Sequence, residues 1–292
     1  KEIKFLEDQI TKLKKRVYKN LTAWQRVQMS RHPDRPDFMR YLDLIFDDFI
    51  ELHGDRTYGD DLAVIGGLAK LGEQNIVVVG QEKGKDTHDR LRRNFGMPHP
   101  EGYRKAIRLF KLAGKFNLPL ITIIDTPGAF AGVGAEERGQ AQVIAKCLST
   151  LSSLPTPTIA VNIGEGGSGG ALAFGVCDRV FMLENAYYSV ITPEGCAAIL
   201  WQDKEKAPEA AEALALTATK LLKMGIVDGV IKEPLGGAHR DPKSTAGKIG
   251  EILKETLGDL LSKPVDELVA LRYERVRQFG VFSDRQESDI IA

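Results

Sequence analysis

The sequence predicts an α/β fold, and three observations support that prediction. Short runs rich in Val and Ile alternate with helical patterns along the chain, as in a sheet covered by helices. Two of these runs, at 119–125 and 159–163, lead directly into glycine-containing loops. The chain of 292 residues has no tandem repeat and no low-complexity linker. We therefore expect an α/β domain over residues 37–240, with helical extensions at 1–36 and 241–292.

The N-terminal segment has the periodicity of an amphipathic helix. Its apolar residues recur every three or four positions, at Ile3, Leu6, Ile10, Leu13 and Val17. We expect one helix that runs to about residue 29, and so narrow a stripe must lie on the body of the chain or on a partner. Pro33 and Pro36 end this helix. Asp37 is then expected to cap a second helix that ends at Phe49.

The remaining elements are predicted from periodicity and from glycine and proline breaks. In chain order we expect a strand pair (62–71 and 75–81), a helix (101–116), a strand (119–125), a helix (135–151), a strand (159–163), a helix (170–175), a strand (179–189), a helix (207–223), a strand (227–232) and two helices (245–261 and 265–279). The tail from Ser283 is polar and is expected to fray.

Composition argues against several classes of protein. Lys and Arg together number 40, as do Asp and Glu, so the net charge gives no sign of affinity for nucleic acid or for membranes. Three widely spaced cysteines form no CxxC pair, which argues against a zinc ribbon or a disulfide framework. No apolar run reaches the ~18 residues of a membrane helix, and the charged N-terminus does not read as a signal peptide. We expect a cytoplasmic protein with reduced thiols and with no metal bound by this chain.

The most glycine-rich stretch, residues 159–175, fits three known motifs. The spacing of a dinucleotide fingerprint is matched by Gly164, Gly166 and Gly169. Ser168 lies between Gly166 and Gly170, as in the nucleophile elbow of a serine hydrolase. The third possibility is an oxyanion hole made of backbone N–H groups at the start of a helix. A packing turn that binds nothing is the alternative to all three.

Chain length and residue order distinguish these possibilities. Only about ten residues separate Gly169 from the next strand, which is short for the crossover helix of a dinucleotide-binding unit. For a hydrolase, Asp228 and His239 follow Ser168 in a suitable order, although only eleven positions separate the two. The chain also has two glycine loops, each after a predicted strand, and parallel strands would bring both loops to one edge of a sheet. Each loop can donate an N–H group to a shared oxygen atom.

A basic loop follows the predicted strand pair. Its cations are Lys83, Lys85, Arg90, Arg92 and Arg93. A run of charges is most often a solvated surface. The functional alternative is a clamp for phosphate groups, which Lys and Arg bind through charge-assisted hydrogen bonds.

Three long motifs carry a family resemblance: LITIIDTPGAFAG at 120–132, VNIGEGGSGGALA at 161–173 and YSVITPEGCAAILW at 188–201. With FDDFIELHGDR at 46–56 as well, nearly the whole chain resembles the carboxyltransferase α subunit of the multisubunit acetyl-CoA carboxylase. The resemblance implies a crotonase-like fold of ββα units (the ClpP/crotonase superfold). It also implies transfer of a carboxyl group from carboxybiotin, presented by the biotin carboxyl carrier protein, to acetyl-CoA. The product would be malonyl-CoA for fatty acid biosynthesis.

The same resemblance implies several partners. A carboxyltransferase β subunit would complete an α2β2 enzyme, and that subunit would carry the zinc ribbon for which this chain has no CxxC pair. ATP would be used only by the partner biotin carboxylase. Given an acyl-CoA substrate, we expect some of the cations of the basic loop to bind the phosphates of CoA.

The implied chemistry suits a site made of main-chain groups. The reaction forms an oxyanion on the acetyl thioester and another on biotin, and preorganised donors are worth ~3 kcal/mol for each. By analogy with the fold, we assign the biotin oxyanion hole to the backbone of Gly128, Ala129, Phe130, Gly169, Gly170 and Ala171. We expect Gly170 to leave room for the substrate oxygen, and the β subunit to hold the acetyl enolate. The turn itself is expected to be shaped by Gly164, Gly166 and Gly167.

Overall fold

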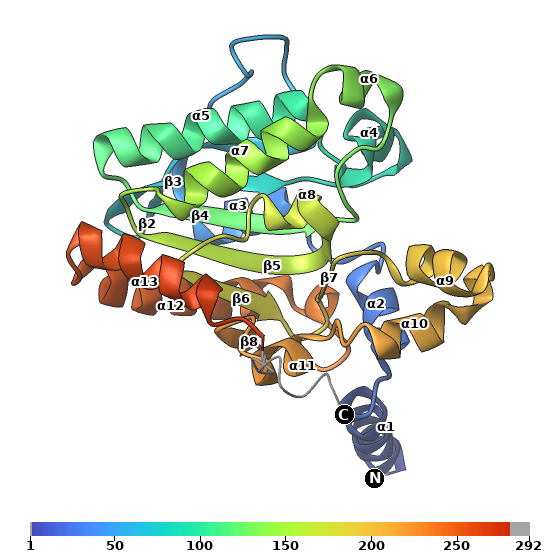
Figure 1. Cartoon of the computed structure of the whole chain (residues 1–292). Helices are drawn as coiled ribbons and strands as arrows, with labels where there is room; N and C mark the ends of the chain where they lie inside the picture. The colour runs from blue at the N-terminus through green and yellow to red at the C-terminus, as the bar shows by residue number, and fades with distance from the viewer. Residues whose placement is uncertain (1, 281–292) are drawn as a thin grey trace, which may run out of the picture.

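A computed structural model describes residues 2–280, and those residues form one mixed sheet of eight strands with helices around it (Figure 1). The strands are β1 (Asp47–Glu51), β2 (Val64–Leu71), β3 (Gln74–Gln81), β4 (Leu120–Thr126), β5 (Thr158–Gly167), β6 (Arg179–Leu183), β7 (Tyr187–Ser189) and β8 (Gly229–Ile231). Their order across the sheet is β1-β2-β3-β4-β5-β6-β8, and β7 pairs with the end of β5. The first three strands are antiparallel and all later pairings are parallel. Strands β4 and β5 therefore end at the same edge.

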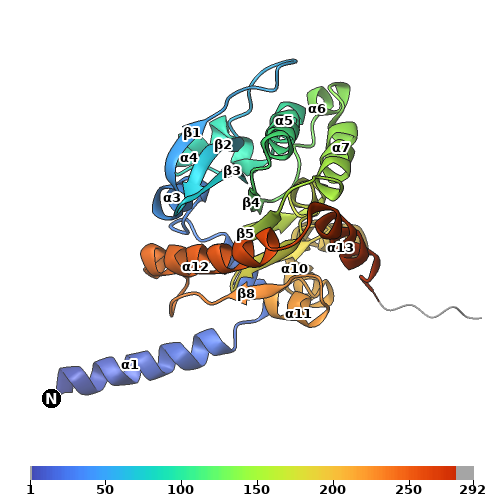
Figure 2. The same cartoon turned by 90° about the vertical axis from the view of Figure 1, so that its left-hand side faces the viewer.

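The described residues form thirteen α-helices, several of which cover the two faces of this sheet. They are α1 (Glu2–Lys19), α2 (Ala23–Ser30), α3 (Phe38–Ile45), α4 (Thr87–Arg92), α5 (Pro100–Phe116), α6 (Val133–Glu137), α7 (Gln140–Ser152), α8 (Ser168–Leu172), α9 (Pro193–Trp201), α10 (Ala207–Ala213), α11 (Ala218–Lys223), α12 (Pro242–Leu261) and α13 (Val265–Arg277). Helices α5 and α7 pack together on one face, and α3 packs with α12 on the other (Figure 2). Helices α9 and α10 project from the body beside β7 (Figure 1).

The core lies between the sheet and these helices. Every residue of β4 and of β5 is buried, as is usual for parallel strands covered on both faces. Leu253 of α12 belongs to the same buried cluster as Phe38 of α3 and Ile121 of β4. The C-terminal helices are thus part of the main core.

Several predicted elements are confirmed with small shifts of their ends. They are the hairpin of β2 and β3, strand β4, helix α5, strand β8 and helices α12 and α13. Asp37 caps α3 as predicted, because its carboxylate accepts the N–H of Arg40 at 2.8 Å. The helix ends at Ile45, however, and Phe49 belongs to β1, which pairs with β2 at the edge of the sheet.

Four predicted elements are each divided in two. The N-terminal helix breaks at residues 20–22, where Thr22 forms a capping box with Gln25 and starts α2. The predicted helix 135–151 breaks at Gly139, and the helix 207–223 breaks near Ala215, because both residues take a positive φ. The predicted strand 179–189 turns at residues 184–186 and becomes β6 and β7. Hydrophobic periodicity continues across each of these breaks, which explains why the sequence did not show them.

Three further predictions concern the C-terminal tail, membrane-spanning helices and the helix at 170–175. The predicted frayed tail from Ser283 lies outside the described residues. Among residues 2–280, no helix combines the length and the apolar character needed to cross a bilayer. The predicted helix 170–175 also differs from the structure, in which β5 continues through Gly167 and α8 begins at Ser168.

Candidate active site

The two glycine loops meet at the carboxyl ends of β4 and β5. The second loop packs directly on the first, since a Cβ atom at Gly170 would lie 2.5 Å from the nitrogen of Ala129 and 2.6 Å from the carbonyl carbon of Gly128. Glycine alone permits this approach. The expectation that Gly170 leaves room for a substrate oxygen is therefore wrong, because the space holds the backbone of the other loop.

Hydrogen bonds reduce the number of available donors. The N–H of Phe130 already donates to the carbonyl of Pro98 at 3.0 Å, and the N–H of Gly128 donates to Oγ1 of Thr126 at 3.1 Å. Ala171 lies beyond the first N–H groups of α8, which are the ones without a helical acceptor. The predicted donors Phe130, Gly128 and Ala171 are thus not free in this structure.

Three of the six predicted donors remain available. Within residues 2–280 the N–H of Ala129 has no acceptor, and Gly169 and Gly170 lie in the first turn of α8, where N–H groups have no helical partner. All three residues line a cavity of about 280 Å³, whose other walls include Ile144, Val190 and Thr192. The geometry offers a polar oxygen several main-chain donors in a small recess with both polar and apolar walls.

The glycines predicted to shape the turn act at other points. Gly164 and Gly166 lie inside β5, not in a turn, and neither has a positive φ. A side chain at Gly164 would collide with the carboxylate of Asp125, and one at Gly166 with the amide of Asn162. Gly167 would collide with the carbonyl of Pro127. Gly164 and Gly167 thus let β5 approach β4 and the loop after it, and Gly166 leaves room for Asn162 and for β7. Ser168, with a φ of 54°, makes the turn.

Gln81, at the end of β3, connects the two loops through hydrogen bonds to Gly170 in α8 and to Asp125 in β4. Its side chain is fully buried, donates to the carbonyl of Gly170 at 2.8 Å and accepts the N–H of Asp125 at 3.2 Å. A buried amide with both ends bonded fixes the groups that it contacts. Gln81 was not among the predicted site residues, although a polar residue at the end of an apolar strand is a usable signal.

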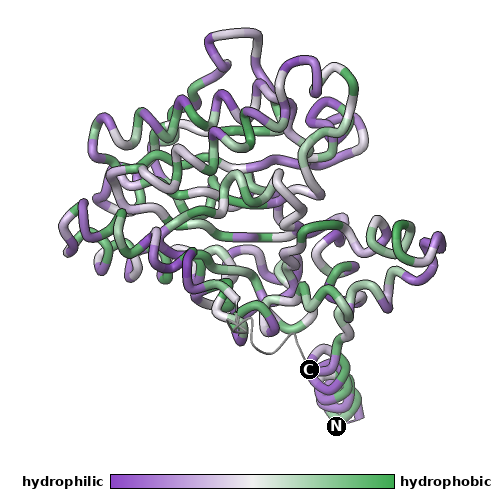
Figure 3. Tube along the Cα trace, viewed as in Figure 1, coloured by the Kyte–Doolittle hydropathy of each residue, from purple (hydrophilic) through white to green (hydrophobic). Residues whose placement is uncertain are grey.

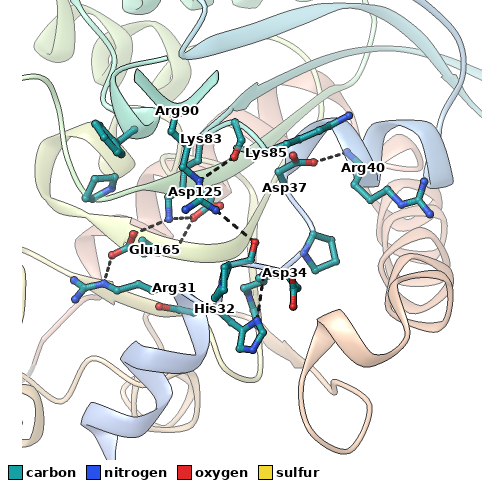
Figure 4. A pocket seen from close by; sticks show the side chains of 17 residues that line it. Arg31, His32, Asp34, Asp37, Arg40, Lys83, Lys85, Arg90, Asp125 and Glu165 are labelled. Atoms are coloured by element: carbon teal, nitrogen blue, oxygen red, sulfur yellow. Dashed lines mark hydrogen bonds and ion pairs between the residues drawn. The ribbon is translucent and has the colours of Figure 1, made fainter. Parts of the chain in front are cut away.

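A cluster of charges lies on the other side of the same strand ends (Figure 4). Lys83 Nζ is 2.6 Å from Asp125 Oδ1 and 2.7 Å from Glu165 Oε2. Glu165 also accepts Arg31 Nε at 2.6 Å and the hydroxyl of Tyr187 at 2.9 Å, and its backbone N–H donates to Asp125 at 2.8 Å. We call Arg31, Lys83, Asp125 and Glu165 the charge cluster.

Electrostatics favour the ionised forms of Glu165 and Lys83, whereas burial raises the pKa of Asp125. Burial on its own raises the pKa of Glu165, but the neighbouring cations Lys83 and Arg31 outweigh burial and lower that pKa to about 2. Burial opposes the charge of Lys83, yet Asp125 and Glu165 raise its pKa. Glu165 is therefore a poor proton acceptor near neutral pH, which agrees with a site that needs no side-chain base.

The basic loop is divided between several roles. Lys83 belongs to the charge cluster, and Arg93 turns inward to Asp89 at 2.9 Å and to the carbonyl of Leu62 at 2.8 Å. Lys85 and Arg90 line an open cleft of about 560 Å³ (Figure 4). Arg92 is exposed at the end of α4 and does not line this cleft. Three of the five predicted cations, Lys83, Lys85 and Arg90, therefore line the cleft, and Lys83 is already paired with two carboxylates. Arg40 of α3 adds a further cation.

The cleft and the small cavity are neighbours. Pro127 contributes to the walls of both, so they lie on either side of the first glycine loop. The cleft also contains Asp34 and Asp37, and its cations outnumber its carboxylates.

The geometry does not support a serine hydrolase. His239 stacks on His32 with ring centroids 3.9 Å apart. Asp228 accepts the N–H of Val180 at 2.7 Å and pairs with Arg275 at 2.8 Å. Within residues 2–280, no hydrogen bond joins Ser168 to a histidine. The three residues of the possible triad are thus held in separate contacts.

Side chains that could ligate a metal are dispersed in the described part of the chain. Among residues 2–280, no group of three or more His, Cys, Asp or Glu side chains is arranged to hold a metal ion. Cys147, Cys177 and Cys196 are all free and buried.

Comparisons with known proteins agree on one family. Residues 1–280 match the profile of the family described as acetyl co-enzyme A carboxylase carboxyltransferase-like. The acetyl-coenzyme A carboxylase carboxyl transferase subunit alpha of Methylococcus capsulatus is 52% identical over 97% of this chain and 88% of its own length. The protein of the same name from Thermus thermophilus is 54% identical over 97% of this chain and 91% of its own.

Solved structures share the fold at low sequence identity. Transcarboxylase 12S superposes with a TM-score of 0.63 at 22% identity, and the match covers 87% of this chain and 45% of that chain. A Pseudomonas malonate decarboxylase hetero-tetramer gives a TM-score of 0.62 at 18% identity, covering 76% of this chain and 91% of that chain. These neighbours have the crotonase fold, so the predicted fold class is confirmed.

Proposed function

Because the chain belongs to the family of acetyl-CoA carboxylase carboxyltransferase α subunits, we propose that it helps to move a carboxyl group from carboxybiotin to acetyl-CoA, forming malonyl-CoA. The carboxybiotin would be presented by a biotin carboxyl carrier protein, and ATP would be used by the partner biotin carboxylase. The malonyl-CoA would supply fatty acid biosynthesis in the cytoplasm.

The observation that best supports this proposal is the trio of available donors at Ala129, Gly169 and Gly170. Carboxybiotin supplies an activated carboxyl group, and a ureido oxygen that gains negative charge needs N–H donors fixed in advance. Three main-chain donors in one small recess meet that need without any reorganisation of side chains. The charge cluster holds the strand ends that carry both loops.

Completion of the site is assigned to a carboxyltransferase β subunit in an α2β2 assembly. A large apolar groove of about 930 Å³ begins at Ser168 and Gly169 and continues over Leu172, Val190 and Val276. Apolar surface of this extent on a protein is typical of an interaction site. A β subunit seated there would close the donor cavity from water and bring its own zinc ribbon and acyl-CoA site to the loops.

The cleft on the far side of Pro127 is assigned to the phosphates of CoA. Lys85, Arg90 and Arg40 line it, and their charges suit a di- or triphosphorylated ligand. Replacing Lys85 and Arg90 together by Met is expected to raise KM for malonyl-CoA severalfold and to weaken its salt dependence, because screening acts on that contact. Arg92→Met, outside the cleft, is the matched control and should leave KM unchanged.

The proposed function itself is tested by reconstitution. The chain alone should not decarboxylate malonyl-CoA in the presence of free biotin, and activity should appear when a carboxyltransferase β subunit of a close relative is added. The proposal would be contradicted if the chain alone produced acetyl-CoA, or if a stable αβ complex produced none.

A further inference from the structure

Helix α1 carries an apolar stripe that nothing in the described part of the chain covers. None of its residues is buried. The stripe residues Ile3, Leu6, Ile10, Leu13 and Val17 are each between 51% and 75% exposed. The helix extends away from the body, and apolar and polar residues alternate along it (Figures 2 and 3). Exposed apolar stripes of this kind are normally paired with another helix.

The charges beside the stripe are divided by sign along the helix. The N-terminal half holds three acidic residues, Glu2, Glu7 and Asp8, and one cation, Lys4, so it is acidic on balance. The C-terminal half holds Lys12, Lys14, Lys15, Arg16 and Lys19. A second copy of α1 laid antiparallel would bring each acidic half against a basic half. A parallel copy would bring like charges together, and that arrangement is unfavourable.

The positions of individual charges support the antiparallel pairing. The stripe follows the heptad pattern, with Ile3, Ile10 and Val17 at a and Leu6 and Leu13 at d. Glu7 and Lys14 then both occupy position e, which faces position e of an antiparallel neighbour. In a parallel pair, Glu2 at position g would instead face Glu7 of the second copy. We propose that α1 pairs antiparallel with α1 of a second copy of this chain.

A pair of helices of this length is about 27 Å long and is marginally stable in isolation. The contact therefore serves best as an addition to other contacts between subunits, where the high local concentration favours it. The inference does not depend on the proposed reaction, because α1 has no residue in the donor cavity or in the cleft.

Charge exchange at position e tests the proposal on the full chain. Glu7→Lys should repel Lys14 of the second copy, and Lys14→Glu should repel Glu7, so each variant alone should associate about tenfold more weakly in sedimentation equilibrium. An equimolar mixture of the two variants should recover the association, since each introduced side chain then faces one of opposite charge on the other variant. The double variant Glu7→Lys, Lys14→Glu should recover it as well. Because both side chains are exposed, these changes should not disturb folding.

Disulfide trapping tests the direction of the pairing. A chain with Leu6→Cys mixed with a chain with Val17→Cys should give mainly the mixed 6–17 disulfide. A parallel pair would give the 6–6 and 17–17 products. Lys12→Cys, which lies off the stripe, is the control for random collision, and the native cysteines are buried.

Three results would overturn the proposal. They are homodisulfides as the main product, no recovery in the mixed charge variants, and α1 variants that associate normally alone but lose binding to a β subunit. The last result would assign the stripe to the β subunit. Carboxyltransferase activity measured in parallel separates this question from the proposed function.

Discussion

The two sides of the β4 and β5 strand ends are built by opposite means. On one side, Ala129, Gly169 and Gly170 present only main-chain groups to a small cavity. On the other side, Lys83 and its partners form the charge cluster. The first region depends on the space that glycine leaves, and the second depends on a balance of charges. A change in side-chain volume should therefore damage the first, and a change in charge should damage the second.

The two regions are also connected through the backbone. Asp125 is two residues before Pro127, and Glu165 is two residues before Gly167, so the charge cluster holds the start of both loops. Gln81 adds a second connection through Gly170 and the N–H of Asp125. We infer that the ion pairs of the charge cluster hold the main-chain N–H donors of the small cavity in place.

The largest effect is expected from Lys83→Met. The change leaves Asp125 and Glu165 as neighbouring buried carboxylates with Arg31 as the main remaining cation, and breaking such a pair typically costs about 3–5 kcal/mol. Urea unfolding should show this loss in the free energy of unfolding. Lys85→Met, at an exposed cation two residues away, should change stability by less than about 0.5 kcal/mol. Equal losses of unfolding free energy in the two variants would mean that the charge cluster does not stabilise the fold more than an exposed cation does.

The pH dependence of stability should show the same charges. The pKa of Glu165 is about 2 in the folded chain against an ordinary value of 4.5, so its stabilisation is complete above pH 4.5 and is lost as the pH falls toward 2. The difference amounts to about 3 kcal/mol. The gap in stability between the wild type and Glu165→Gln should therefore narrow as the pH falls from 5 to 2.

The pKa of Glu82 is shifted in the direction opposite to that of Glu165. Burial raises its pKa to about 7, with the nearby charge of Asp37 in the same direction, so its contribution is present below pH 4.5 and is lost as the pH rises through 7. The gap between the wild type and Glu82→Gln should accordingly widen toward acid. If the difference in stability from the wild type changed with pH in the same direction for Glu165→Gln and Glu82→Gln, the opposite pKa shifts of the two residues would be contradicted.

On the main-chain side, Gly170→Ala should lower kcat about 100-fold, the usual loss for one oxyanion donor. The new methyl group must displace Ala129 and with it the neighbouring N–H. Gly258→Ala in α12 is the control, because nothing lies within 4 Å of its added Cβ. Circular dichroism and binding to the β subunit should be normal in both variants. Wild-type activity of Gly170→Ala would contradict a donor site made by the two loops.

This comparison also shows what the sequence could and could not reveal. Most of the strands, both glycine stretches and their meeting at one edge follow from local patterns, and the structure confirms them. Strand β1 was wrongly predicted as the end of a helix, and β6 and β7 as a single strand. The partners of Lys83 lie 42 and 82 positions away in the chain, and no local pattern joins them. The same holds for Gln81 and Gly170. Local geometry was also hidden where glycines permit close approach of two strands, since the sequence of Gly164–Gly167 looks like a turn.

The smallest effect is expected at Ser168, where a main-chain site and a side-chain nucleophile lead to different predictions. Ser168 is exposed, lies next to the donors and has the positive φ of a sharp turn. We therefore expect Ser168 to form the turn and to take no part in the chemistry. Ser168→Ala should keep kcat within about twofold, because the N–H groups of Gly169 and Gly170 are unchanged.

Ser168→Gly sharpens that test. Glycine takes a positive φ without strain, so this variant should keep its activity and gain a few tenths of a kcal/mol to about 1 kcal/mol in stability. A fluorophosphonate probe should label neither the wild type nor the variants. Labelling at Ser168, or loss of turnover in Ser168→Ala with normal binding to the β subunit, would show that a side chain takes part in the chemistry. In that case the contrast between a main-chain region and a charged region would no longer describe this site.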